Sequence, residues 1–194
     1  MRPGRIENRA QSPNSGGKAL HAAVRRHAGE AAFVHRCQVH KKHNLVDHLP
    51  DEHKADVKKK LQNAYAMVDY TEAKRALERL HRELMELNPS AARSLEEGME
   101  ETLTVHKLRV PDQLRRTLCC TNVIESAFSI VETVCRNVKR WQACDQIERW
   151  VGSGLLVAEC QFRRVIGHRQ IPLLLASMAN AVSKKPIAKD AAVA

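Results

Sequence analysis

Apolar residues recur at intervals of three and four positions through the middle of this 194-residue chain. Such spacing gathers apolar side chains on one face of an α-helix. Thr71 is a natural N-cap, and Asn88-Pro89 ends one helix and begins the next, because proline is tolerated at a first helical position. Three helices are therefore predicted, and the first two are expected to form an antiparallel pair. Their expected buried residues are Val57, Leu61, Ala64, Tyr65 and Val68, then Ala73, Leu77, Leu80, Leu84 and Leu87, and then Ala92, Leu95, Met99 and Leu103.

The C-terminal half predicts two more helices. Pro111 begins a new unit, and Asn122 signals the start of a helix that continues into a basic stretch at residues 136–140. A further helix is predicted from about Asp145 to Phe162. Its core side is expected from Trp150, Leu155, Leu156 and Val157, while Gly152 and Gly154 lower helix propensity or allow close packing.

The N-terminal segment differs in composition from the rest. Residues 1–17 carry glycine, proline and serine with almost nothing apolar, which predicts an extended or disordered leader. A short helix is expected from Lys18 to His27, and residues 31–35 are the one plausible strand. The small, polar residues after Ser183 predict a frayed tail.

Charge and composition favour a polyanionic partner. The chain has 32 Lys and Arg against 22 Asp and Glu, a formal charge of +10. Aromatic residues make up only 4%, which argues against a protein that binds single strands by stacking many bases. The six cysteines are irregularly spaced, and no apolar signal segment opens the chain, so reduced thiols in a cytoplasm are expected. The apolar stretch at residues 171–182 is too short to span a bilayer, which needs roughly 20 residues.

Glu125 is a lone carboxylate at a predicted helix start, shortly before the basic stretch. A carboxylate can hold a divalent cation while nearby cations hold phosphates, as two-metal phosphoryl transfer requires. The alternative is structural, because Asn122 as N-cap and Glu125 three residues later also fit a capping arrangement. The two roles are compatible.

Two basic clusters are candidates for contacts to phosphates. Arg136, Lys139 and Arg140 would form one stripe if they lie on a helix, although a solvated charged face has the same pattern. Arg163 and Arg164, with His168 and Arg169, form the second candidate patch. Trp141 and Trp150 are expected in the core or at its rim, with stacking of Trp141 on DNA as the less favoured reading.

Cys37 and His40 make half of a possible zinc site, with His43 one helical turn further on. No second cysteine pair follows at zinc-finger spacing, so a zinc site is disfavoured.

Several short segments occur in an order that is more specific than any one of them. They are Gly17-Lys18-Ala19-Leu20, Arg36-Cys37-Gln38-Val39-His40-Lys41, Asn44 with Leu49-Pro50, Arg116-Thr117, Thr121-Asn122-Val123-Ile124-Glu125-Ser126, Asn137-Val138-Lys139-Arg140-Trp141 and Phe162-Arg163-Arg164. From about residue 16 to 182 the chain resembles the C-terminal part of the catalytic region of mutator-type bacterial insertion-sequence transposases.

The resemblance implies an RNase H-like core interrupted by a helical insertion. The expected fold class is mainly α, with an incomplete RNase H-like α/β core of at most one or two strands. The resemblance divides the chain into five regions. They are a non-family leader at 1–15, a core remnant at 16–48, a helical insertion at 49–118, a C-terminal helical part at 119–182 that carries the glutamate, and a disordered tail at 183–194.

In such transposases two aspartates and one glutamate bind two divalent ions, Mg²⁺ or Mn²⁺, that activate the nucleophile and stabilise the leaving oxygen. Glu125 falls on the glutamate position and would be both catalytic and metal-binding. Cys37 and His40 match a Cys-x-x-His signature of the family without an assigned role, and Asn122 belongs to the glutamate motif.

The chain departs from the family pattern upstream. Ser15 stands where the second aspartate is expected, and Glu7 is the only acidic residue before Lys18. Serine lacks the negative charge that hard cations favour, so stable binding of Mg²⁺ or Mn²⁺ is not expected. The chain alone is predicted not to cleave DNA.

Two functions follow. The first is that of a truncated, inactive transposase that keeps affinity for the backbone of double-stranded DNA at insertion-sequence ends. The second is a helical DNA-binding or oligomerisation module that associates with its own copies or with a full-length transposase. A helix-turn-helix regulator is less favoured, because no compact recognition-helix pair is evident.

Overall fold

The computed structural model describes residues 22–29, 32–140 and 144–183. The chain divides into two compact units, residues 1–34 and 35–194. The first contains a helix over residues 22–28. The predicted leader, the Gly17–Leu20 motif, the tail after Ser183 and Trp141 lie outside the described residues.

The strand expected at residues 31–35 is wrong over its described part, because residues 32–35 have no regular structure and no strand occurs in the described ranges. A strand requires a neighbour with which to exchange backbone hydrogen bonds. The next residue, Arg36, is held by a helical turn rather than by a strand, since its amide donates to the Glu101 carbonyl at 3.1 Å.

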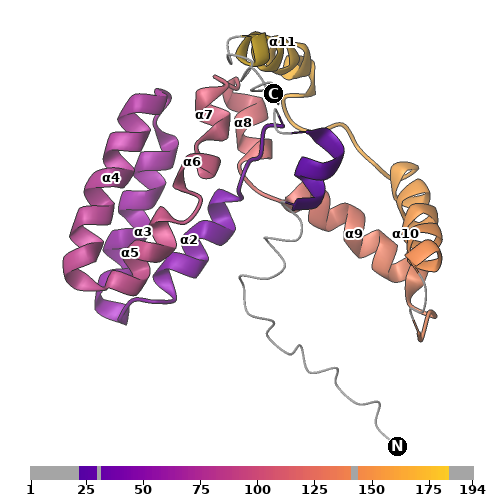
Figure 1. The fold of residues 1–194 in the computed structure, drawn as a ribbon, viewed down its shortest axis with the longest axis horizontal. Helices are drawn as coiled ribbons and strands as arrows, with labels where there is room; N and C mark the ends of the chain where they lie inside the picture. The colour runs from indigo at the N-terminus through magenta and orange to yellow at the C-terminus, as the bar shows by residue number, and fades with distance from the viewer. Residues whose placement is uncertain (1–21, 30–31, 141–143, 184–194) are drawn as a thin grey trace, which may run out of the picture. The chain divides into compact units, whose positions relative to one another are not determined.

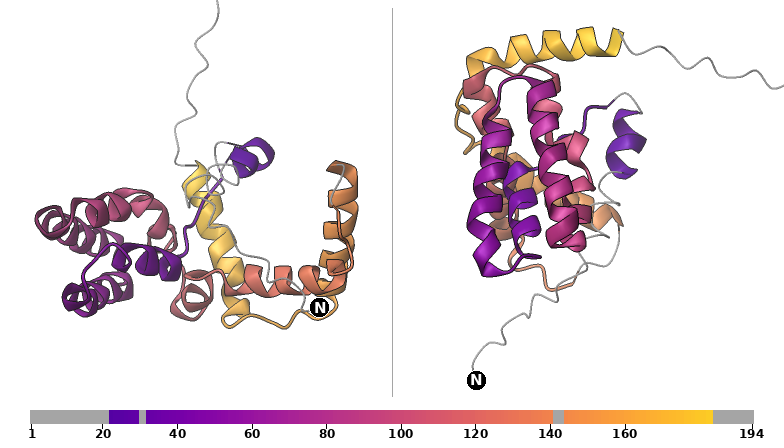
Figure 2. Two further views of the ribbon diagram at one scale, coloured as in Figure 1. Left: turned by 90° about the horizontal axis from the view of Figure 1, so that it is seen from below. Right: turned by 90° about the vertical axis from the view of Figure 1, so that its left-hand side faces the viewer.

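Four helices of the second unit pack side by side around the main apolar core (Figures 1 and 2). They are α2 (Gln38–Val46), α3 (Asp51–Ala66), α4 (Tyr70–Leu87) and α5 (Pro89–Glu96). The predicted helical pair is confirmed as α3 and α4, which the short connection at residues 67–69 joins. Their buried residues are Val57, Leu61 and Ala64 in α3, and Ala73, Leu77, Leu80 and Leu84 in α4.

The ends of these helices correct two expectations. The N-cap of α4 is Asp69 rather than Thr71, since the Asp69 carboxylate accepts hydrogen bonds from the amides of Thr71 and Glu72. Asn88 caps α5 as its side chain accepts from two amides, with Pro89 at the first helical position as predicted. Val68 and Leu87, expected in the core, are exposed because they lie where the helices end.

The third predicted helix is broken at Gly98. The chain continues after α5 as two short helices, α6 (Met99–Thr102) and α7 (Thr104–Lys107). Gly98 adopts φ +70°, a left-handed conformation that a helix interior excludes and that glycine adopts without strain. Leu103 is nevertheless buried, as predicted.

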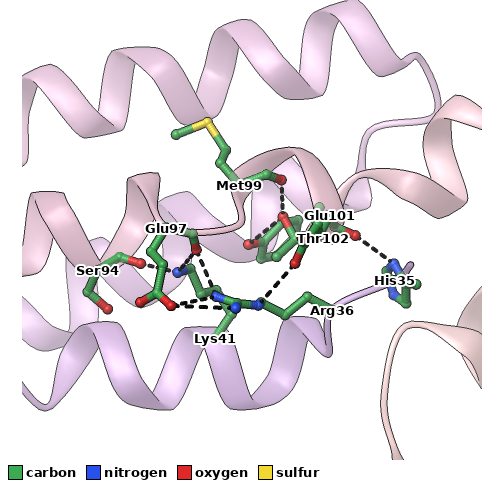
Figure 3. A network of polar contacts seen from close by, with 9 residues as sticks. His35, Arg36, Lys41, Ser94, Glu97, Met99, Glu101 and Thr102 are labelled. Atoms are coloured by element: carbon green, nitrogen blue, oxygen red, sulfur yellow. Dashed lines mark hydrogen bonds and ion pairs between the residues drawn. The ribbon is translucent and has the colours of Figure 1, made fainter. Parts of the chain in front are cut away.

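A polar network holds this break against α2 (Figure 3). The Lys41 ammonium donates to the carbonyls of Ser94 and Glu97. Arg36 donates to the Glu97 carbonyl at 3.0 Å and pairs with the Glu101 carboxylate at 3.4 Å. The network therefore satisfies the carbonyls that the end of α5 leaves without helical partners.

The C-terminal part of the second unit contains five further elements. They are α8 (Asp112–Leu118), α9 (Asn122–Cys135), α10 (Cys144–Glu159), the 3₁₀ turn η1 (His168–Gln170) and α11 (Ile171–Ser183). The α9 and α10 helices pack against each other (Figure 1). They approach closely at Gly154, where a Cβ atom would lie 3.1 Å from the Cα of Val131.

The core side predicted for α10 is wrong. The large residues expected there are 39–66% exposed: Trp150, Leu155, Leu156 and Val157. Gly154 and Ala158 face α9 instead, because small residues let two helix backbones approach closely. In α11, none of the described side chains is buried.

No single helix in the described ranges is long and apolar enough to cross a membrane. Taken together, α8 and α9 meet the length and composition of a span, but they are bent by 43° at their junction.

Candidate functional site

Glu125 lies in the first turn of α9, beside the start of α2. The two regions are joined by a hydrogen bond from the Gln38 amide to the Cys119 carbonyl at 2.9 Å. Glu125 Oε1 is 3.6 Å from His40 Nε2 and accepts a hydrogen bond from the Thr121 hydroxyl at 2.5 Å. Two segments more than 80 residues apart in the sequence thus meet at one carboxylate.

Cys37 completes this group of side chains, which we call the Glu125 cluster: Cys37, His40, Thr121 and Glu125. The Cys37 thiol is buried at the N-cap of α2, 3.2 Å from His40 Nδ1 and 3.6 Å from the Thr121 hydroxyl. Burial raises the pKa of this thiol, but hydrogen bonds from His40 and Thr121 outweigh burial and lower it overall.

The capping arrangement expected at Asn122 is not formed. The N-cap of α9 is Thr121, and Asn122 is the first helical residue, with an exposed side chain. The Glu125 carboxylate accepts its hydrogen bond from the Thr121 hydroxyl. The i, i+4 spacing of Thr121 and Glu125 is the sequence signal for this contact, and it was missed.

The chemistry available to the Glu125 cluster is limited by its donor atoms. They are one carboxylate, one imidazole, one thiol and one hydroxyl, and the Glu125 and His40 side chains are each more than half exposed. Within the described ranges, no group of three or more His, Cys, Asp or Glu side chains is arranged to hold a metal ion. The cluster can accept and donate hydrogen bonds and supply one carboxylate ligand.

The first basic cluster does not form the helical stripe that its spacing predicts. The α9 helix ends at Cys135, the last residue of its buried face, and the Val138 amide closes a turn onto the Cys135 carbonyl at 2.8 Å. Arg136, Lys139 and Arg140 therefore lie in the turn and the segment after it, and all three are exposed.

Arg163 and Arg164 line an open groove of about 680 Å³. The groove runs between the end of α8, the start of α9 and residues 161–166. Arg116 and Phe162 also line it, a relation that no local spacing indicates, because the residues come from separate segments. His168 and Arg169, the other members of the predicted patch, lie in η1 and do not line the groove.

Comparison with known proteins gives one consistent result. Residues 15–155 match the family profile described as "Transposase, Mutator family". The chain is 29% identical over 132 residues to the transposase for insertion sequence element IST2 of Acidithiobacillus ferrooxidans, covering 68% of this chain and 43% of that protein. It is 36% identical over 106 residues to the transposase for insertion sequence element ISRM5 of Rhizobium meliloti (strain 1021), covering 55% of this chain and 26% of that protein.

The matched region thus spans less than half the length of either relative. No solved structure matches the chain.

Proposed function

Because the chain belongs to the mutator family of transposases, we propose that its 194 residues bind the backbone of double-stranded DNA at insertion-sequence ends but do not cleave DNA by themselves. The observation that carries the proposal is the Glu125 cluster. Sequence resemblance relates two separate segments to the family, the Cys-x-x-His segment and the glutamate segment. In the structure these two segments lie together at the Glu125 carboxylate.

The absence of cleavage follows from the donor set. The resemblance implies that a second and a third carboxylate hold two divalent ions in this family. Mg²⁺ and Mn²⁺ favour several oxygen ligands, and a thiol and an imidazole do not replace carboxylates for such ions. The residues of the Glu125 cluster therefore do not fit a pair of metal ions, and the missing acids would have to come from elsewhere.

Affinity for DNA follows from the exposed cations. Arg136, Lys139 and Arg140 lie just after α9, and Arg163 and Arg164 line the groove beside its start. Phosphate contacts by Arg and Lys give binding that does not depend on base sequence. The net charge of +10 also favours electrostatic attraction to DNA.

A cleavage assay tests the catalytic half of the proposal. Purified protein is incubated with supercoiled plasmid and Mg²⁺ or Mn²⁺, and nicked product is measured. We expect none. Metal-dependent nicking that disappears in Glu125→Ala would show that this chain assembles a working site and would overturn the proposal.

A binding assay tests the other half. Fluorescence anisotropy with a blunt duplex compares the wild type with the variant R136A/K139A/R140A. We expect weaker binding by the variant, because three phosphate contacts are lost. The matched control is R75A/R79A, which removes two exposed cations from α4. Equal weakening per cation removed by the two variants would mean that net charge, and not this segment, attracts DNA.

A second candidate function is an oligomerisation module that associates with its own copies or with an intact transposase. Large exposed apolar side chains on α9 to α11 favour it, among them Phe128, Leu156 and Leu175. Size-exclusion chromatography with light scattering tests it. A concentration-dependent dimer that Leu156→Glu dissociates would support this function, and a monomer at all concentrations would exclude self-association.

A further inference from the structure

The groove beside α9 has fixed walls. The Thr117 hydroxyl at the end of α8 donates to the Ile166 carbonyl at 2.9 Å, and the Leu114 amide donates to Gln170 Oε1 at 3.1 Å. Gly167 adopts φ +80° and comes so close to α8 that a Cβ atom would lie 2.4 Å from the Leu114 nitrogen. These contacts hold the segment at residues 161–166 opposite the start of α9.

The lining of the groove combines one aromatic side chain with cations. Phe162 is 55% exposed, and Arg116, Arg163 and Arg164 line the same groove. In the described part of the chain, no Asp or Glu lines the groove. An exposed aromatic ring among arginines is complementary to a flat, apolar base joined to phosphates.

We propose that this groove binds an unpaired nucleotide of a DNA strand, with its base stacked on Phe162 and the adjoining phosphates held by Arg116, Arg163 and Arg164. The inference rests on the proposed function, since it specifies which form of DNA binds to the groove that Arg163 and Arg164 line. Bases inside a duplex are already stacked on their neighbours, so only a nucleotide outside the stack offers a free face to Phe162.

The number of aromatic residues limits the length of the bound strand. Phe162 is the one aromatic residue among those that line the groove in the described part of the chain. A protein that binds a long single strand stacks successive bases on several aromatic side chains, whereas one ring can stack on one base. The groove therefore favours a junction between duplex and single strand over a continuous single strand.

The groove also places this nucleotide next to the Glu125 cluster. Asn122 and Ser126 of α9 line the groove. Asn122 lies about one helical turn before Glu125, and Ser126 directly follows it. A strand held on Phe162 would therefore pass close to the carboxylate that matches the family's glutamate.

Anisotropy with three forms of one DNA tests the proposal. They are a blunt duplex, the same duplex with a short single-stranded extension, and that extension made abasic so that it keeps only sugar and phosphate. The wild type is expected to bind the extended duplex about fivefold or more tightly than the other two, the effect of stacking one base. Phe162→Ala is expected to abolish that preference, so that the variant binds all three DNAs with equal affinity.

Phe128→Ala is the matched control, because Phe128 is 49% exposed on α9 and does not line the groove. Circular dichroism of both variants checks that helix content is preserved. Equal affinity of the wild type for all three DNAs, or a preference that survives in Phe162→Ala or with the abasic extension, would overturn the stacking proposal while leaving duplex binding intact. Failure to bind any of the three would overturn the proposed function itself.

Discussion

His35 couples the stability of the polar network to pH. Its Nδ1 lies 3.0 Å from the Glu101 carbonyl (Figure 3), and its buried Nε2 has no hydrogen-bond partner within the described ranges. Burial lowers the pKa of His35 from 6.5 to about 4; the hydrogen bond to the Glu101 carbonyl raises it and the neighbouring His106 lowers it, but both effects are smaller than that of burial. The ring is therefore neutral in the folded protein at neutral pH, with its proton on Nδ1 directed at the carbonyl.

Acidification is expected to destabilise the fold through this residue. Between pH 6.5 and about 4 the unfolded chain binds a proton at His35 that the folded chain does not. The free energy of unfolding therefore falls as the pH drops through this window, by up to about 3 kcal/mol. Urea unfolding of the wild type and His35→Asn at several pH values measures the effect, because asparagine can donate to the same carbonyl without titrating. Identical pH profiles would show that His35 does not titrate differently in the two states.

Lys41 is a buried cation with a structural role. It is 4% exposed, and burial followed by the charge of Arg36 lowers its pKa to about 8, so it stays protonated at neutral pH. We expect Lys41→Met to lower the free energy of unfolding by about 1–3 kcal/mol, because the Ser94 carbonyl loses its donor. Lys59→Met, at an exposed position of α3, should change it by less than about 0.5 kcal/mol. Equal effects of the two variants in urea unfolding would contradict this role.

At the scale of elements, sequence periodicity predicted α3 and α4 well, because each buries a continuous stripe of leucine, valine and alanine between clear end signals. It did not predict the break at Gly98, where the apolar spacing continues to Leu103 although the helix stops. Periodicity indicates which residues are buried. The turn at Gly98 is held by Arg36 from a distant segment, and it does not change the spacing of the buried residues. The end of α9 at Cys135 was missed for a related reason, since Cys135 is buried and its thiol contacts the Trp150 carbonyl of α10, a distant segment.

The core side of α10 shows a different limit. Large apolar residues suggested one face of the helix, but the contact with α9 is made by Gly154 and Ala158. The geometry of the Glu125 cluster could not be predicted from local sequence either. Its contacts between Cys37, His40 and Glu125 join distant segments, and no local pattern indicates that these segments lie close together. The family resemblance identifies these three residues from sequence, but it gives no distances between them.

The two glycines of α10 provide a test of the packing. A Cβ atom at Gly152 would meet nothing within 4 Å, so Gly152→Ala should raise the free energy of unfolding by about 0.5–1 kcal/mol through helix propensity. Gly154→Ala would place its Cβ 3.1 Å from the Val131 backbone, and the cost of separating the helices should exceed that gain, with a net loss of about 1–3 kcal/mol. Thermal unfolding of both variants measures the contrast. Stabilisation by Gly154→Ala would mean that α9 and α10 are not in close contact.

For the whole molecule, the decisive quantity is the charge that reaches DNA rather than the total charge. The formal +10 counts every cation, including Lys41 and Arg36, which are engaged inside the polar network. The proposed function assigns phosphate contacts to five exposed cations: Arg136, Lys139, Arg140, Arg163 and Arg164. Each neutralised phosphate releases bound counterions, so the number of contacts can be read from the salt dependence of the affinity.

Five contacts predict that the logarithm of the duplex affinity falls with the logarithm of salt with a slope of about −4.5, so that raising salt from about 50 to about 200 mM weakens binding by roughly 500-fold. The variant R136A/K139A/R140A should show a slope smaller by about 2.7, and R75A/R79A should keep the wild-type slope. Anisotropy titrations at four salt concentrations measure all three slopes. A flat wild-type line would exclude phosphate contacts as the source of affinity, and a slope near −9 would mean that the whole surface charge, rather than these five residues, binds DNA.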